Sequence, residues 1–182
     1  MSLLPMRWSS VLALLVGLPE PVWSQEDINP VFGPDDLVAV QHLESDFARA
    51  LWKRDFATII DMVPPPILDR ISADNNMNPA TFRSMQLQEL ENVADQIETK
   101  SFDVVLESMT TGFTMTGRTY ALAPTQLVVT LANGFELELP SQTLFFEDND
   151  VWFMLPLDQP GQIDMLKSVY PDFMGVDIGE AP

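Results

Sequence analysis

The sequence predicts an α+β fold in which N-terminal helices pack on a strongly curved antiparallel sheet. Two observations lead to this prediction. From about residue 35 to residue 100, apolar residues recur every three or four positions, which is the period of a helix. From residue 102 onward they alternate with polar residues, which is the period of a strand, and turn residues separate the alternating runs. Helices followed by strands are typical of α+β domains.

The first 24 residues have the pattern of a secretory signal peptide. Arg7 supplies a positive charge, residues 11–18 form a short apolar run, and the small residue Ser24 precedes Gln25. The run is shorter than the ~20 apolar residues that span a bilayer. We therefore expect a periplasmic or secreted chain, starting near Gln25 and not inserted in the membrane. Residues 25–34 are expected to form a flexible leader.

Composition limits the remaining possibilities. The chain has 182 residues, of which 46% are apolar, enough for one hydrophobic core. We assign residues 35–157 to the α+β domain and residues 158–182 to a C-terminal extension with a short helix and an acidic tail. With no cysteine, disulfides and thiol catalysis are excluded. The net charge of −18 argues against nucleic acid and anionic lipid as partners. The acids are scattered, which favours solubility over a cationic partner as their role.

The helical region divides into four segments. The first helix starts at Gly33-Pro34-Asp35 and carries an apolar stripe to Leu51. Asp55 caps a second helix, which prolines 64–66 terminate, and the third proline opens a short helix over Ile67–Ile71.

Residues 72–78 are expected to form a loop. Asn78-Pro79 then starts the longest helix, with Asn78 as the N-cap and the proline in the first turn. We expect this helix to end near Lys100. Its inward stripe comprises Phe82, Met85, Leu90, Val93, Ala94 and Ile97.

Five strands follow, predicted at 102–109, 119–123, 126–131, 135–146 and 151–155. Asn133-Gly134 is the pair preferred in a two-residue type I′ hairpin turn. Pro124 is expected to break or bulge a strand, and Pro140 to lie at an edge or bulge. A short helix within residues 160–171 and a frayed end from Gly175 complete the chain.

Two segments resemble the NTF2-like superfamily, whose fold is also called the cystatin-like α+β cone. FARALWKRDFATIIDMVPPPILDRI (residues 47–71) is similar to its helix, tight turn, second helix and break. TLFFEDNDVWFML (residues 143–155) is similar to its closing hairpin. The resemblance covers about residues 35–157, while the triple proline and the C-terminal extension depart from it. It implies a bent sheet around a pocket and allows a homodimer through the open sheet face. Because the superfamily includes isomerases, dehydratases, transport factors and binding proteins, it assigns no single activity.

Few residues indicate catalysis. His42 is the only histidine, and no G-x-S-x-G elbow accompanies it. No phosphate-binding loop is present, so we predict no nucleotide and no cofactor. Residues 147–150 (EDND) offer oxygen ligands, but a calcium loop needs a glycine at its sixth position, where Phe153 stands. We predict no metal there and interpret EDND as a hairpin turn whose acids stay solvated at the tip.

A pocket inside the cone is the remaining candidate site. An isomerase or dehydratase would need a desolvated carboxylate base, with Asp61 or Asp103 as candidates and Tyr120 as a hydrogen-bond donor. The preferred hypothesis is a module that binds a small apolar ligand or a protein partner. The cofactor-free enzyme and an envelope accessory or assembly protein are alternatives. The candidate pocket residues are Trp52, Phe56, Asp61, Phe82, Asp103, Tyr120 and Trp152.

Overall fold

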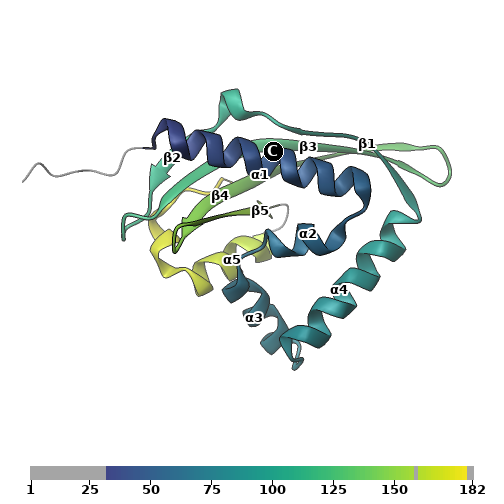
Figure 1. Ribbon diagram of the computed structural model, residues 1–182, viewed down its shortest axis with the longest axis horizontal. Coiled ribbons are helices and arrows are strands. Elements are labelled where there is room, and N and C mark those ends of the chain that lie inside the picture. The colour runs from purple at the N-terminus through teal and green to yellow at the C-terminus, as the bar shows by residue number, and fades with distance from the viewer. Residues whose placement is uncertain (1–31, 158–159, 180–182) are drawn as a thin grey trace, which may run out of the picture.

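A computed structural model describes residues 32–157 and 160–179, within which four α-helices precede the sheet in the chain and a fifth follows it (Figure 1). Two short 3-10 helices are also present: η1 (Leu106–Ser108) lies between β1 and β2, and η2 (Pro171–Gly175) follows α5. No helix in the described ranges is long and apolar enough to cross a membrane. The α-helices are α1 (Pro34–Lys53), α2 (Phe56–Asp61), α3 (Pro65–Asp74), α4 (Pro79–Ala94) and α5 (Pro160–Val169).

The strands form one antiparallel sheet that curls into a half-barrel. Their order is β1-β3-β4-β5, and β2 pairs with the first part of β3, beyond the end of β1. The predicted α+β class, with helices on a strongly curved antiparallel sheet, is confirmed. The strands are β1 (Ile97–Val104), β2 (Thr110–Phe113), β3 (Thr119–Leu131), β4 (Glu136–Asp148) and β5 (Val151–Leu157).

Each face of the sheet carries its own apolar cluster, because successive side chains of a strand point to opposite faces. On one face, Phe145 and Met154 pack with Val40 of α1, and we call this the α1 face. On the other face, Leu144 and Phe146 pack with residues of α3, α5 and η2, and we call this the α5 face. Helices therefore cover both faces.

The predicted helix starts are confirmed by capping contacts. The Asp36 carboxylate accepts a hydrogen bond of 2.7 Å from the Gly33 amide at the start of α1. Asp55 accepts from the Thr58 amide at 3.2 Å, and Asn78 accepts from the Thr81 amide at 2.9 Å. Such caps satisfy amide groups that the first helical turn leaves without partners.

Two helix ends differ from the predictions. α3 begins at Pro65 and runs to Asp74, so the first three residues of the expected loop at 72–78 are helical. α4 ends at Ala94, and residues 97–100 form the first part of β1 instead of a helical turn. As a result α1, with 20 residues, is longer than α4, with 16. The apolar residues at 93, 94 and 97 fit a helical stripe, but pairing with β3 overrides that local pattern.

The sheet also corrects three strand predictions. β3 continues through Pro124, whose carbonyl accepts from the Val105 amide at 2.9 Å. The predicted strand at 102–109 is divided between the end of β1 and η1. The β3–β4 turn has three residues instead of two, and Gly134 (φ 81°) is its residue with positive φ. Pro140 lies in the part of β4 that extends beyond its pairing with β5. This agrees with the predicted edge position.

The C-terminal part confirms the predicted short helix but not the frayed end. α5 occupies Pro160–Val169. After η2, Val176 and Ile178 are 7% and 6% exposed and belong to the cluster on the α5 face. These apolar side chains alternate with polar residues in sequence, which is why the segment looks like an acidic tail. The predicted signal peptide and residues 25–31 of the predicted leader lie outside the described residues.

Candidate functional site

A first apolar cavity of about 420 Å³ lies where the end of α1 meets the end of α4 and the start of β1. Two exposed charged residues, Arg54 and Glu98, also line it. Cavities of this size, with mostly apolar walls and a few polar groups, are typical of small-molecule sites. The apolar lining includes Leu51, Trp52, Phe56, Leu90, Val93 and Leu127.

Two further cavities adjoin the first. The second, of about 310 Å³, lies between the helices α2, α3 and α4 and the strand β5, and it shares Leu90 with the first. The third, of about 320 Å³, lies between α1 and the sheet and shares Leu51 and Leu127 with the first. The second and third share Phe47 and Pro156. The three cavities therefore surround one stretch of α1.

The cavities exist because α4 does not lie flat on the sheet. In Figure 1 it runs obliquely away from β1 toward α3. Phe82 is its only buried residue among those described, while Met85 and Val93 are 36% and 47% exposed. The predicted inward stripe is therefore only partly covered. Apolar surface that is left open in this way marks binding sites more often than scattered exposed residues do.

Three hydroxyl-bearing residues of β3 and β4 are among those that line the third cavity. Thr125 pairs directly with Ser141 across β3 and β4, and Thr143 follows two residues later on the same face. Thr125 and Thr143 are 5% and 0% exposed, and the Thr125 hydroxyl donates to the Thr143 hydroxyl at 2.8 Å. This hydroxyl row lies among Phe47, Leu51 and other apolar side chains. None of the sequence predictions included this row.

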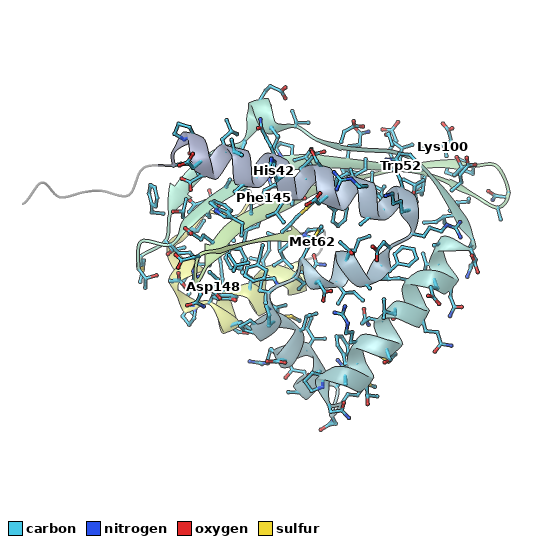
Figure 2. The ribbon with its side chains drawn as sticks, viewed as in Figure 1. His42, Trp52, Met62, Lys100, Phe145 and Asp148 are labelled. Carbon is cyan, nitrogen blue, oxygen red and sulfur yellow. The ribbon has the colours of Figure 1, made fainter. Side chains whose placement is uncertain are left out.

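Three of the sequence-predicted pocket residues line the cavities. Trp52, 55% exposed at the end of α1 (Figure 2), and Phe56, 7% exposed, line the first cavity. Phe82 of α4, 4% exposed, lines the second. All three lie on the helices that border the opening, but Trp52 and Phe56 do not share a cavity with Phe82.

The three residues proposed for a catalytic constellation do not meet. Asp61 is exposed at the end of α2 and forms an ion pair with Arg83. Asp103 is exposed on β1, on the face opposite the cavities. Tyr120 also faces away from the cavities, and its ring packs on Phe173 with centroids 5.8 Å apart. Neither Asp61 nor Asp103 therefore lies beside Tyr120 in this arrangement.

Trp152 and His42 also lie apart from the cavities. The Trp152 ring makes an edge contact with Phe32, with centroids 6.1 Å apart. His42 is exposed on α1 (Figure 2). Within the described ranges, no three His, Asp or Glu side chains are grouped so that they could hold a metal ion.

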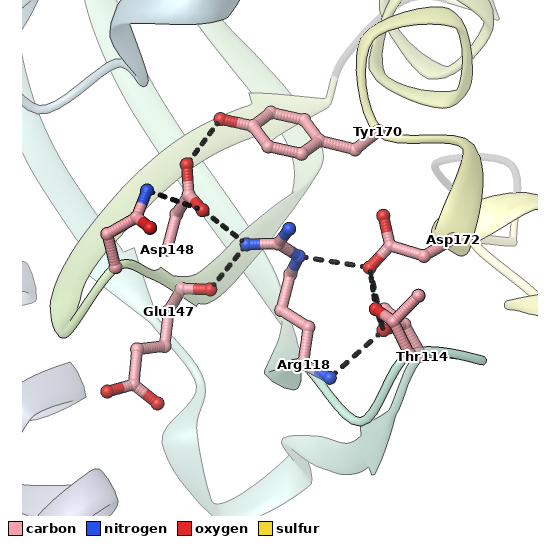
Figure 3. A network of polar contacts seen from close by, with 8 residues as sticks. Thr114, Arg118, Glu147, Asp148, Tyr170 and Asp172 are labelled. Carbon is pink, nitrogen blue, oxygen red and sulfur yellow. Dashed lines mark hydrogen bonds and ion pairs between the residues drawn. The ribbon is translucent and has the colours of Figure 1, made fainter.

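A second polar arrangement centres on Arg118, in the turn before β3 (Figure 3). Its guanidinium donates to Asp148 at 2.8 Å and to Asp172 at 3.0 Å. It also donates to the Glu147 carbonyl at 2.9 Å and lies over the Tyr170 ring, 4.9 Å from the centroid. The Arg118, Asp148 and Asp172 side chains are 19%, 16% and 8% exposed. One cation therefore bridges two largely buried carboxylates from different parts of the chain.

Hydroxyl groups complete this Arg118 network. Thr114 and Thr116 donate to the same oxygen of Asp172, at 2.7 and 2.9 Å. Tyr170 donates to the second oxygen of Asp148 at 3.0 Å. With both carboxylates so engaged, the network joins the β2–β3 turn, the β4–β5 hairpin and η2. We interpret it as a structural tie, since it borders none of the three cavities.

The EDND stretch is a hairpin turn, as predicted. Asn149 and Asp150 both have positive φ, 53° and 62°, which defines a two-residue type I′ turn. The expectation that its acids all stay solvated is wrong for Asp148. This residue ends β4 and points to Arg118 instead of to solvent.

The network shifts the pKa of its members. Burial alone would raise the pKa of Asp172, but hydrogen bonds from Thr114, Arg118 and Thr116 outweigh it, so the pKa lies below its usual value. Burial and the hydrogen bond to Asp148 together raise the pKa of the Tyr170 hydroxyl well above its usual value. Burial would lower the pKa of Arg118, but its bonds to Asp148 and Asp172 raise it on balance.

These shifts predict how stability depends on pH. The lowered pKa of Asp172 means that its carboxylate stabilises the fold above its unfolded pKa, about 4, and that this contribution is lost as pH falls through the lower folded pKa. The free energy of unfolding should therefore fall below about pH 4, and less steeply in Asp172→Asn. Urea unfolding of both proteins at successive pH values measures this. If the free energy of unfolding falls equally steeply with pH in both proteins, the pKa of Asp172 does not differ between the folded and unfolded states.

No protein-family model, curated protein or solved structure that was compared with this chain matches it. The arrangement of helices on a curled half-barrel sheet is compatible with a cone-like fold. Assignment to the NTF2-like superfamily therefore remains a proposal.

Proposed function

We propose that this chain is an exported NTF2-like module that binds a small apolar ligand in the three adjoining cavities. The observation that carries the proposal is the contiguous apolar lining around Phe47, Leu51 and Leu90, which borders cavities of about 420, 310 and 320 Å³. Each is near the lower end of the volumes typical of ligand pockets, and shared walls make a larger combined site. The order of helices and strands supports the superfamily assignment, and the pattern of the first 24 residues supports export.

The exposed apolar side chains that line the first cavity favour a ligand-binding role over a role in packing alone. Val93 and Trp52 keep about half of their surface exposed, although burial of a large apolar side chain is favourable by about 1.5–3 kcal/mol. A ligand in the first cavity would cover part of this surface. The charged groups at this cavity are also engaged already: Arg54 pairs with Asp95 at 3.0 Å, and Glu98 pairs with Lys100 at 2.9 Å. Apolar contact is then the main attraction that remains.

Filling the first cavity should abolish binding. Val93→Trp places a large ring in the cavity at a half-exposed site, so the cost to folding is small. We expect the dissociation constant of the neutral dye N-phenylnaphthylamine, followed by its fluorescence, to rise at least about tenfold. Met85→Trp is the matched control, because Met85 is similarly exposed on the same helix but lines none of the three cavities.

Native mass spectrometry of the purified protein completes the test. A retained small molecule, present in the wild type and in Met85→Trp but reduced in Val93→Trp, supports the proposal. The protein mass in the same spectrum shows whether the exported chain starts at Gln25. A wild-type protein that binds neither the dye nor any copurifying molecule would exclude a ligand-binding role.

A protein partner is the second candidate. The β3–β4 hairpin exposes 61% of Phe135, 37% of Leu137 and 41% of Leu139. Leu139 also lines the third cavity, so a partner could continue onto the same surface. Replacing Phe135 and Leu137 by serine would weaken capture of a partner without changing dye binding. The isomerase or dehydratase alternative has no observation in its favour, because Asp61, Asp103 and Tyr120 lie apart.

A further inference from the structure

Arg54 has an uncommon backbone conformation for its residue type. It follows the last residue of α1 and has a φ of 56° and a ψ of 34°, in the left-handed region. The next amide, that of Asp55, donates to the Ala50 carbonyl at 2.8 Å, a hydrogen bond that commonly ends a helix at such a residue. Glycine favours this position, because a Cβ atom makes the left-handed conformation unfavourable. The turn alone therefore does not explain an arginine here.

The Arg54 side chain joins the end of α1 to the end of α4. Its guanidinium donates to the Ala94 carbonyl at 2.8 Å and to the Asp95 carboxylate at 3.0 Å. Ala94 is the last residue of α4, where carbonyl groups lack partners within the helix and a nearby cation is favourable. The Arg54 and Asp95 side chains are both more than half exposed, so the ion pair contributes little to the stability of the fold.

These contacts lie at the first cavity. Arg54 itself lines this cavity, together with Leu51 and Trp52 of α1 and Val93 of α4. Two walls of the cavity thus come from the helices that Arg54 joins. Phe82, near the other end of α4, is the one buried residue of this helix among those described, and the helix runs obliquely away from β1 (Figure 1). Packing on the sheet therefore does not fix the distance between the ends of α1 and α4.

The division of the site favours a slender ligand. Leu90 lines both the first cavity, of about 420 Å³, and the second, of about 310 Å³. A single aliphatic chain can extend from the first cavity past Leu90 into the second, whereas a bulky ring system is confined to the first. No Lys, Arg, His, Asp or Glu is among the described residues that line the second cavity, which suits an aliphatic chain.

We propose that Arg54 is a positioning residue that holds the end of α4 close to α1 and thereby limits the width of the first cavity, so that the site selects a slender aliphatic ligand over a bulky one. The inference rests on the proposed ligand-binding function and adds the residue that determines the shape of the ligand. It also explains the left-handed arginine, because unfavourable backbone conformations are retained where a side chain serves a binding site.

Competition for bound N-phenylnaphthylamine tests the inference. Decanol and 1-adamantanemethanol are neutral alcohols of similar carbon number, but one is a slender chain and the other a bulky cage. Arg54→Gly keeps the turn, because glycine favours its conformation, and removes the tie to α4. We expect the preference for decanol over the cage to fall at least about fivefold from the wild type to this variant. Comparing the same two alcohols on both proteins cancels their different hydrophobicity.

Two further variants distinguish a positioning role from a general effect. Arg54→Lys keeps a cation near the Ala94 carbonyl and should retain more of the preference than Arg54→Gly does. Arg49→Ala serves as the control, because Arg49 forms an exposed ion pair with Asp46 in α1 but lines none of the three cavities. The control should show the wild-type preference.

The outcomes separate this inference from the broader proposal. If the dye binds but Arg54→Gly shows the wild-type preference, Arg54 does not determine the shape of the ligand and the binding function stands. If the wild-type protein does not bind the dye, both are overturned. Should Arg54→Gly fold poorly in urea unfolding, Asp95→Ala removes the ion pair without changing residue 54. It should lower the preference in the same direction, and an unchanged preference would then overturn the inference.

Discussion

Replacing Arg118 by methionine should lower the free energy of unfolding by about 3 kcal/mol. Methionine retains contact with the Tyr170 and Phe146 rings but leaves Asp148 and Asp172 without their cation. The side chains of both carboxylates are less than one-fifth exposed, so water compensates for little of the loss. Urea unfolding at neutral pH, followed by circular dichroism, measures the change.

Arg70→Met is the matched control for this experiment. Arg70 pairs with Asp74 at 2.8 Å within α3, but both side chains are about half exposed. Such a surface pair contributes about 0.5 kcal/mol or less. Asp172→Asn should also reduce the effect of Arg118→Met, because the two residues interact directly. Equal losses for the two arginine variants would show that the network does not stabilise the fold.

Replacing Phe173 by alanine should cost about 3–5 kcal/mol. Phe173 is completely buried, and its ring lies 5.3 Å from that of Phe146 and 5.8 Å from that of Tyr120. The substitution leaves a cavity in the cluster on the α5 face, which α5 and η2 cannot fill without moving. The expected loss of stability is larger than for a residue in a peripheral extension, because the Phe173 ring packs against residues of two strands of the central sheet.

The neighbouring Met174→Ala is the control, because Met174 is 66% exposed in the same short helix. It should change the free energy of unfolding by less than about 0.5 kcal/mol. The same urea experiment compares the two variants, and thermal unfolding gives an independent measure. A small effect of Phe173→Ala would mean that η2 can detach while the sheet remains folded.

Much of the helical part could be predicted because its determinants are local. Asp55 and Asn78 each cap a helix through an amide only three residues away. Such signals need no knowledge of the fold. The end of α4 could not be predicted in this way, because Ile97 fits the helical stripe and becomes a strand only through its pairing with Leu131.

The hydroxyl row was not predicted because the predicted pairing of β3 with β4 is shifted by one residue. The structure has a three-residue turn before β4, which places Thr125 opposite Ser141. A two-residue turn at Asn133-Gly134 would place Thr125 opposite Gln142, and Ser141 would then belong to the other face. The predicted break at Pro124 further obscured the alignment. A correct register would have brought the hydroxyl groups together from sequence alone.

The Arg118 network carries no comparable sequence signal. Arg118 lies 30 residues from Asp148 and 54 residues from Asp172, and no periodicity connects them. Asp148 belongs to an acidic turn, where solvation is the ordinary expectation. Only the curl of the sheet and the return of the chain after β5 bring these side chains together.

The position of the C-terminal segment has a consequence for the order in which the molecule assembles. Leu166, Phe173, Val176 and Ile178 supply a large part of the cluster on the α5 face, yet the ribosome makes them after every strand of the sheet. Synthesis proceeds from the N-terminus. Apart from the residues of α3, which precede the sheet, the apolar layer on the α5 face therefore forms only when these late residues emerge.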